Sequence, residues 1–332
     1  MDHVAILSRA WTMVWRYRAL WLFGFLFALA GGGSSFGAPP GGGRSPSGGT
    51  GSPGSGVVPP LPPSLPTLSS NTIGTIILVV VAVVLLLVVV VTIVHYVTET
   101  ALIAGVDEIE STGGALTVRR GFRLGWSRQA WRLFLTEFVI YLIFGLAAVL
   151  LLALAASPLL LLLIQANIVR AIAVGAATLL ILSAILFLIV AVLALSLVMP
   201  YIQRRVVLGR QGVMAAFRQG FRLVRASLRD TGLMWLILVA IGFLWAIVKI
   251  PVIIVLVVAA VLVGGVPAGL AYLASHSWVP AVIIGLPLFL LVLIPTAAFI
   301  EGLFQIYNSS AWTLAYRQVT ERHGDLLPVN GG

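Results

Sequence analysis

The sequence contains no cysteine and few charged side chains. Among its 332 residues, 9% are charged and 60% are hydrophobic, whereas roughly a quarter of the residues in a soluble domain are charged. The absence of cysteine excludes disulfides, thiolate metal sites and cysteine nucleophiles. A single domain of this length cannot bury so much apolar surface away from water. The composition therefore argues against a soluble enzyme and predicts a membrane protein with several spans.

Acidic residues and lysine are also scarce. The chain has 20 basic and 10 acidic residues and a net charge of +10, and all the basic residues except Lys249 are arginine. Such an excess can indicate a nucleic acid or an anionic membrane surface as partner. No nucleic-acid-binding module accompanies these arginines. We therefore expect the partners to be the lipid bilayer and its anionic phospholipids, not nucleic acid, and leave open an unidentified membrane protein.

Motifs for catalysis and cofactor binding are missing as well. The four histidines are scattered and form no metal-binding pattern. The sequence has no Gly-x-Ser-x-Gly elbow, no P-loop and no dinucleotide-binding fingerprint. We therefore expect no enzymatic activity, no cofactor and no metal site.

Five apolar runs are long enough to cross a bilayer, and backbone hydrogen bonding in lipid makes them helices. A shorter run at 20–30 crosses only if its helix begins near Met13. A cleaved secretory signal is the alternative there, since Ala28-Leu29-Ala30 resembles a cleavage site. The five long runs cover 73–97, 131–156, 171–199, 233–263 and 279–304.

The basic residues fall mainly on one side of the predicted membrane. With a first crossing at 13–30, seventeen of them lie on the side of both termini, and Arg44 and Arg170 lie on the other. Positively charged loops stay in the cytoplasm. We therefore predict six spans in a bacterial plasma (inner) membrane, with cytoplasmic N- and C-termini. A cleaved signal gives the same topology after residue 73.

The sequence divides into four parts. Residues 1–30 form an amphipathic helix and the first span, and residues 73–318 form the membrane bundle, followed by a short cytoplasmic tail at 319–332. Between the first two spans, 30 of the 42 residues at 31–72 are Gly, Pro or Ser. Such a segment buries too little apolar surface to fold, so we predict a disordered external loop. Its role as a docking tail or as a plain spacer is left open.

An internal repeat precedes pairs of spans. The segment Arg119-Arg120-Gly121-Phe122-Arg123-Leu124 recurs 99 residues later as Arg218-Gln219-Gly220-Phe221-Arg222-Leu223. A fainter copy is Ala10-Trp11-Thr12-Met13. The repeat predicts an all-α membrane protein of about six transmembrane helices plus two or three cytoplasmic interfacial amphipathic helices, built as repeated units of one such helix and a hairpin.

The interfacial helices combine apolar and arginine stripes. In the last copy the apolar stripe is Val213, Phe217, Phe221, Val224 and Leu228, and in the first it is Val4, Leu7, Trp11, Val14 and Trp15. This pattern is typical of helices that lie in the membrane plane, where arginine attracts anionic lipid headgroups. Anchoring of the bundle without specific lipid recognition is the alternative. The candidate lipid-contacting residues are Arg119, Arg123, Arg218, Arg222, Arg225 and Arg229.

Ionisable groups in apolar spans are costly and therefore functional candidates. The carboxylates either pair with arginines of the interfacial helices or form an acidic vestibule for a cation or proton. Lys249 is placed in the outer half of the membrane, away from the glutamates. Asp107, Glu108 and Glu110 are expected to be solvated in a short turn. The candidates in or near the spans are His95, Glu99, Glu137, Lys249 and Glu301.

Three segments resemble a family of bacterial membrane proteins. They are the N-terminal motif at 9–26, Met199-Pro200-Tyr201 with the helix at 216–224, and the closing Trp-Thr-Leu-Ala-Tyr-Arg at 312–317. These motifs are similar to proteins related to the glycerophosphoryl diester phosphodiesterase membrane domain, many of which carry only domains of unknown function. The resemblance implies a polytopic plasma-membrane protein. It implies no phosphodiesterase activity, because the soluble catalytic domain has no counterpart in this sequence.

Two functions remain in competition at this stage. The leading expectation is a non-catalytic scaffold or lipid-interacting accessory protein. The alternative is a small-solute or lipid transporter that uses Lys249, the proline-containing last two spans and the inner glutamates. A continuous cavity lined by both Lys249 and Glu301 would favour the transporter, since transporters bind solute between several spans. Spans packed with Leu, Val and Ala and no cavity would favour the scaffold.

Overall fold

The computed structural model describes residues 2–32, 70–114, 116–164, 166–209 and 211–322. These residues form helices and no strands, so the all-α prediction is confirmed. Most of the predicted loop at 31–72 and of the tail at 319–332 lies outside the described residues. The helices are α1 (His3–Arg16), α2 (Ala19–Phe27), η1 (Ala28–Gly32), α3 (Ser70–Thr112), α4 (Val118–Gly125), α5 (Arg128–Ala156), η2 (Ser157–Leu163), α6 (Asn167–Val207), α7 (Val213–Ala226), α8 (Leu228–Ser275) and α9 (Trp278–Arg322).

Five of these helices are long and apolar enough to cross a membrane: α3, α5, α6, α8 and α9. They contain the five predicted apolar runs, and most of them continue well past the runs into segments that carry charged residues. The chain is therefore a multi-pass membrane protein. Its many exposed Val, Leu and Ile side chains lie on these helices, as expected where the solvent is lipid.

The first crossing differs from its prediction. Met13 belongs to α1, and the chain then bends by 100° before α2, so the expected single helix from Met13 to Ala30 is wrong. Helix α2 has nine residues and the π-helical η1 has five. Together they reach about 21 Å, less than the roughly 30 Å of a bilayer core. A sixth span requires counting this bent pair as one crossing, and it stays a prediction.

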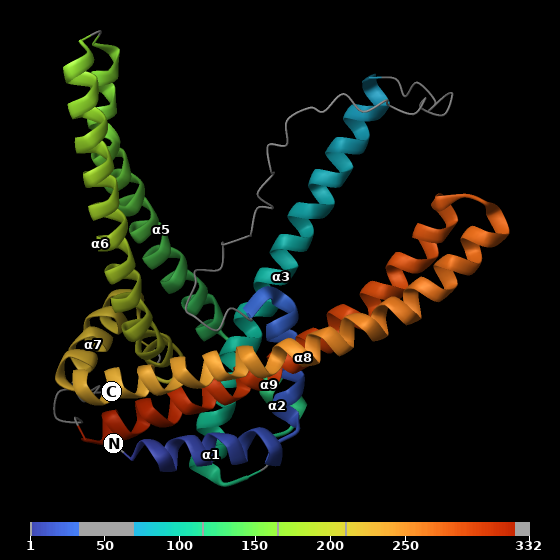
Figure 1. Ribbon diagram of the computed structural model, residues 1–332. Coiled ribbons are helices and arrows are strands. Elements are labelled where there is room, and N and C mark those ends of the chain that lie inside the picture. Colours follow the sequence, from blue (N-terminus) through green and yellow to red (C-terminus); the bar gives the residue numbers. More distant parts are fainter. Residues whose placement is uncertain (1, 33–69, 115, 165, 210, 323–332) are drawn as a thin grey trace.

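Three arms diverge from a common base (Figure 1). One arm is α3, the second is the α5–α6 pair and the third is the α8–α9 pair. Helices α1 and α7 and the last turns of α9 lie at the base, whereas the N-terminal end of α3 lies at the tip of its arm. Most of the described arginines therefore lie at the base. This agrees with the prediction that the basic residues after 73 gather on one side of the membrane. Which side faces the cytoplasm stays a prediction.

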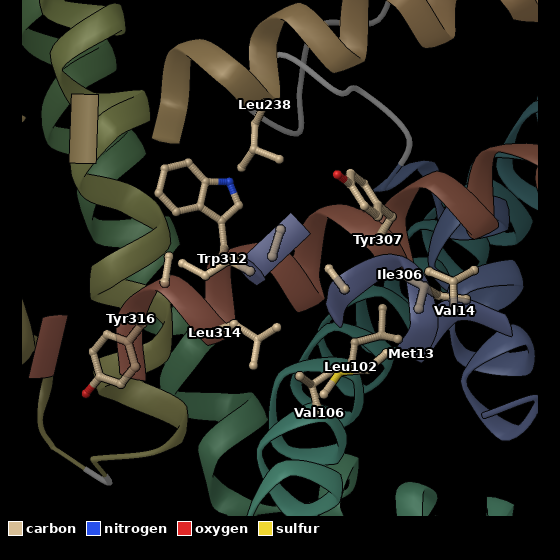
Figure 2. Close-up of a cluster of buried hydrophobic side chains, with 14 of the residues drawn as sticks. Met13, Val14, Leu102, Val106, Leu238, Ile306, Tyr307, Trp312, Leu314 and Tyr316 are labelled. Atoms are coloured by element: carbon tan, nitrogen blue, oxygen red, sulfur yellow. The ribbon is translucent and has the colours of Figure 1, made fainter. Parts of the chain in front are cut away.

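A hydrophobic core holds the base together (Figure 2). It joins Met13 and Val14 on α1 to Leu102 on α3, Leu238 on α8 and Ile306 on α9. On α3 the core residues Leu102, Val106 and Ile109 recur at helical spacing, so this helix buries one face at the base.

Helix α2 joins this core through a glycine contact. A Cβ atom added to Gly24 would lie 2.6 Å from the carbonyl oxygen of Gly302. The two backbones therefore touch, which only glycine permits, and this crossing positions the α2–η1 segment on α9.

The order of elements agrees with the predicted repeat. Helices α1, α4 and α7 each precede apolar helices: α2 and α3, α5 and α6, and α8 and α9 respectively. The aligned positions Ala10, Gly121 and Gly220 are all buried, and a Cβ atom on Gly121 would lie 2.5 Å from the ring of Phe23. In each repeat, the short helix therefore packs against the base through a small residue. The aromatic residue that follows in each copy, such as Trp11, is exposed.

Candidate functional site: a polar cavity at the base of the arms

A cavity of about 420 Å³ lies between α3, α5, α6, α8 and α9. The end of α2 and η1 add Phe27 and Gly31 to its wall. Polar groups from four helices line it, among them Glu99 of α3, Glu137 of α5, Gln203 of α6 and Gln305 of α9. A polar cavity between several spans is the feature that distinguishes a solute-binding bundle from a packed one.

The centre of the site is a pair of glutamates bridged by one amide. Gln203 donates from Nε2 to Glu99 Oε1 at 2.8 Å and to Glu137 Oε1 at 2.7 Å. Carboxylates only accept hydrogen bonds, so they fix the amide with its nitrogen towards them. Its Oε1 atom accepts from Nη1 of Arg204 at 3.0 Å. Glu137 is only 3% exposed, and such buried polar groups are costly unless they are bonded.

The remaining carboxylate oxygens differ in their partners. Tyr96 donates from its hydroxyl to Glu137 Oε2 at 3.2 Å. Glu99 Oε2 is buried and accepts no hydrogen bond within the described part of the chain, and Nε2 of His95 lies 3.7 Å away. The site therefore retains one buried acceptor for a donor that the described residues do not supply.

Arg204 contributes the positive charge of the cluster. Its Nη1 atom also donates to the carbonyl of Pro200 at 3.0 Å, and Nη2 donates to the carbonyl of Ser309 at 3.4 Å. The guanidinium is thus engaged mainly by backbone carbonyls of α6 and α9. The cluster therefore combines two carboxyl groups with one guanidinium group.

Aromatic rings form much of the cavity wall. The ring of Phe27 stacks on that of His95, with 4.7 Å between centroids. Aromatic faces beside carboxylates attract organic cations, because the ring face carries negative potential. The aromatic side chains that line the cavity are Phe27, Tyr141, Phe144, Trp235, Phe304 and Trp312.

A second polar feature lies farther along α8 and α9. Lys249 Nζ is 2.7 Å from Glu301 Oε2, and both residues line a second cavity of about 430 Å³. The placement of Lys249 away from the glutamates is therefore wrong: α8 begins at Leu228 and pairs with α9, which brings residues 249 and 301 side by side.

The expected arginine partners of the glutamates are also wrong. Glu99 and Glu137 bond to Gln203, and Glu301 pairs with Lys249, so none of these bonds comes from α1, α4 or α7. Gln203 was not predicted, because a single uncharged amide does not mark a functional site in a sequence. Arg204 was used only as a positive charge that indicates the orientation in the membrane, although the polar run from 203 to 205 interrupts the apolar pattern of α6.

The acidic end of α3 is half-buried and forms ion pairs, whereas free carboxylates in a short turn were predicted. Helix α3 continues to Thr112, so no turn forms at the expected place, and its three carboxylates join three different helices. Asp107 pairs with Arg317 of α9 at 3.0 Å, Glu110 with Arg9 of α1 at 2.7 Å, and Glu108 with Arg120 of α4.

The predicted lipid-contacting arginines lie apart from the cavity. Arg119 and Arg123 on α4, and Arg218, Arg222 and Arg225 on α7 with Arg229 just after it, are exposed. The residues of the predicted apolar stripes are divided between buried and exposed positions. Val14 and Val224 are buried, whereas Trp11, Trp15, Phe217, Phe221 and Leu228 face outward.

The chain matches a family of unknown function, DUF7544, over residues 9–322. It belongs to this family. The match includes all the residues of both cavities, but it gives no link to the glycerophosphoryl diester phosphodiesterase membrane domain, so that resemblance is not supported. No curated protein and no solved structure matches the chain. Among the described residues, no group of three or more His, Asp or Glu could hold a metal ion.

Proposed function

We propose that the protein is a non-catalytic carrier of the bacterial inner membrane that binds a small organic cation in the cavity between its arms. The observation that carries this proposal is the Glu99–Gln203–Glu137 bridge in an aromatic-lined cavity. It favours the transporter alternative over the scaffold that composition alone favoured. Both termini are proposed to lie in the cytoplasm, on the side of the base.

Charge supports a cation as the ligand. The cluster has two carboxylates and one guanidinium, and its arginine is held by carbonyl groups. A cation that enters the cavity meets two carboxyl groups, and its N–H group can donate to the unused Glu99 Oε2. Trp235 and Trp312 also line the cavity, and aromatic rings are favourable neighbours for a cation.

Size supports a small solute. The cavity volume of about 420 Å³ falls at the lower end of the range for small-molecule sites, roughly 300–1,000 Å³. A scaffold gains nothing from two buried carboxylates there, because apolar side chains of similar volume are often as stable as buried ions.

Binding and transport can be measured separately with the full chain in liposomes. Methylammonium offers N–H donors, whereas tetramethylammonium offers only charge and methyl groups. We expect both to change the fluorescence of the cavity tryptophans, with methylammonium bound more tightly because it can bond to Glu99. The Glu99→Gln/Glu137→Gln variant should lose at least tenfold in methylammonium affinity and uptake, whereas Glu321→Gln, an exposed site on α9, should match the wild type. Equal affinity and uptake in both variants would refute the proposal.

A lipid-interacting role is a second candidate, and the outer face of α7 favours it. Exposed Phe217 and Phe221 lie on the same helix as exposed Arg218, Arg222 and Arg225, an arrangement that suits a surface with apolar chains below anionic headgroups. Each arginine contributes about 1 kcal/mol in such a field. The test is native mass spectrometry with added phosphatidylglycerol. The Arg218→Gln/Arg222→Gln/Arg225→Gln/Arg229→Gln variant should retain fewer lipids than Arg170→Gln, and equal retention would exclude the role.

A further inference from the structure

The two cavities adjoin the same two segments of the chain. Phe27 and Gly31 line the first cavity, whereas Ala28 and Leu29, which lie between them in sequence, line the second. The end of α2 and the start of η1 therefore contribute to the walls of both cavities.

Helix α9 contributes to both walls in the same way. Gln305 lines the first cavity and Glu301 lines the second. The Nε2 atom of Gln305 donates to Glu301 Oε1 at 3.5 Å. One hydrogen bond thus joins a polar group of the first cavity to the ion pair of the second.

The shared segment is irregular at this point. Residues Ala28–Gly32 are π-helical, and Gly31 has φ 84° and ψ 8°, a conformation that favours glycine. One turn earlier, the Gly24–Gly302 contact fixes α2 on α9. The segment between the cavities is therefore anchored at one end and departs from regular α-helix at the other.

Lys249 is a cation tethered at the second cavity. Its Nζ atom lies 2.7 Å from Glu301 Oε2, and its side chain is 28% exposed against 12% for Glu301. The rest of the second cavity is apolar, with Ile253, Leu293 and Ile294 among its lining. A carboxylate in such surroundings needs a cation beside it, and a mobile cation can take the place of the tethered one.

We propose that Glu301 is a second cation site, at which the organic cation that leaves the first cavity displaces the ammonium group of Lys249. Lys249 returns to Glu301 when the solute departs, so the carboxylate is never left without a positive partner. This inference rests on the proposed function, and it names the next residue with which the same solute pairs after Glu99 and Glu137.

The decisive variant removes the ion pair without leaving an unpaired charge. Lys249→Met/Glu301→Gln keeps the side-chain volumes close to the originals, and such replacements of buried pairs are often neutral for stability. We expect its melting temperature and its methylammonium affinity in the first cavity to stay near wild type. Methylammonium uptake should fall at least tenfold. A double variant that melts normally and transports at the wild-type rate would show that the pair is only structural, and would overturn the inference.

The single variant Lys249→Met gives a second, opposite signature. It leaves Glu301 without its tethered partner, so the solute is held more strongly at Glu301 and released more slowly. Both KM and kcat for methylammonium uptake should therefore fall, which loss of a structural contact alone does not produce. An unchanged KM together with an unchanged kcat would contradict the displacement step.

The two proposals fail in different ways. If Glu99→Gln/Glu137→Gln binds and carries methylammonium normally, the first cavity is not the binding site and the proposed function fails. If that variant loses binding but the folded Lys249→Met/Glu301→Gln variant carries solute normally, only the second site fails.

Discussion

Replacing Gln203 by leucine should destabilise the protein through the two glutamates that it bridges. The change removes hydrogen bonds of 2.7 and 2.8 Å to two buried carboxylates, and leucine keeps most of the volume. Hydrogen bonds to charged groups contribute about 1.5–3 kcal/mol each. Water in the adjoining cavity can replace part of this, so we expect a loss of about 3 kcal/mol. For a chain of 332 residues the melting temperature should fall by roughly 4 °C.

The assay is thermal unfolding in lipid nanodiscs, followed by tryptophan fluorescence. Gln318→Leu is the matched control, because Gln318 is a half-buried glutamine of α9 that lies outside the cavity. If the loss comes from the carboxylates, adding Glu99→Gln and Glu137→Gln to Gln203→Leu should restore much of the melting temperature, since neighbouring groups are not additive. A Gln203→Leu variant as stable as the control would refute this account of the bridge.

Two further predictions concern the packing of the base. Gly302→Ala should lower the melting temperature by several degrees, because its Cβ atom would lie 2.6 Å from the carbonyl carbon of Gly24. The control Gly145→Ala, whose Cβ atom would have no atom within 4 Å, should raise the melting temperature slightly. Equal effects of the two changes in unfolding scans would contradict the contact. Asp107→Asn should cost no more than about 1 kcal/mol, because the pair with Arg317 is partly exposed, and a larger loss in the same assay would show that the pair is effectively buried.

Much of the fold could be predicted from the sequence because its signals are local. An apolar run of span length must be a helix in lipid, so the five long helices were found from composition alone. The boundaries were less well predicted, because α3 and α9 continue as helices past the apolar runs, into segments that hydropathy does not identify. The bend between α1 and α2 was missed because no proline or glycine lies at Tyr17 or Arg18.

The candidate site could be predicted only in part. Glu99, Glu137 and Glu301 could be identified as candidates because a charged side chain in lipid is costly, and this needed no knowledge of their partners. Their partners depend on how antiparallel helices are paired and aligned, and a single sequence contains little information on this. The pairing of α8 with α9 brings Lys249 to Glu301, and the packing of α6 against α5 and α3 brings Gln203 between two glutamates.

The central claim is that the cavity binds a small organic cation at Glu99 and Glu137. Its most direct test is a titration of the full-length protein in nanodiscs with methylammonium, followed by tryptophan fluorescence, to which Trp235 and Trp312 of the cavity wall contribute. The account predicts a saturable change that weakens at least tenfold in Glu99→Gln/Glu137→Gln and persists in Glu321→Gln. No saturable change in the wild type, or an equal change in all three proteins, would contradict it.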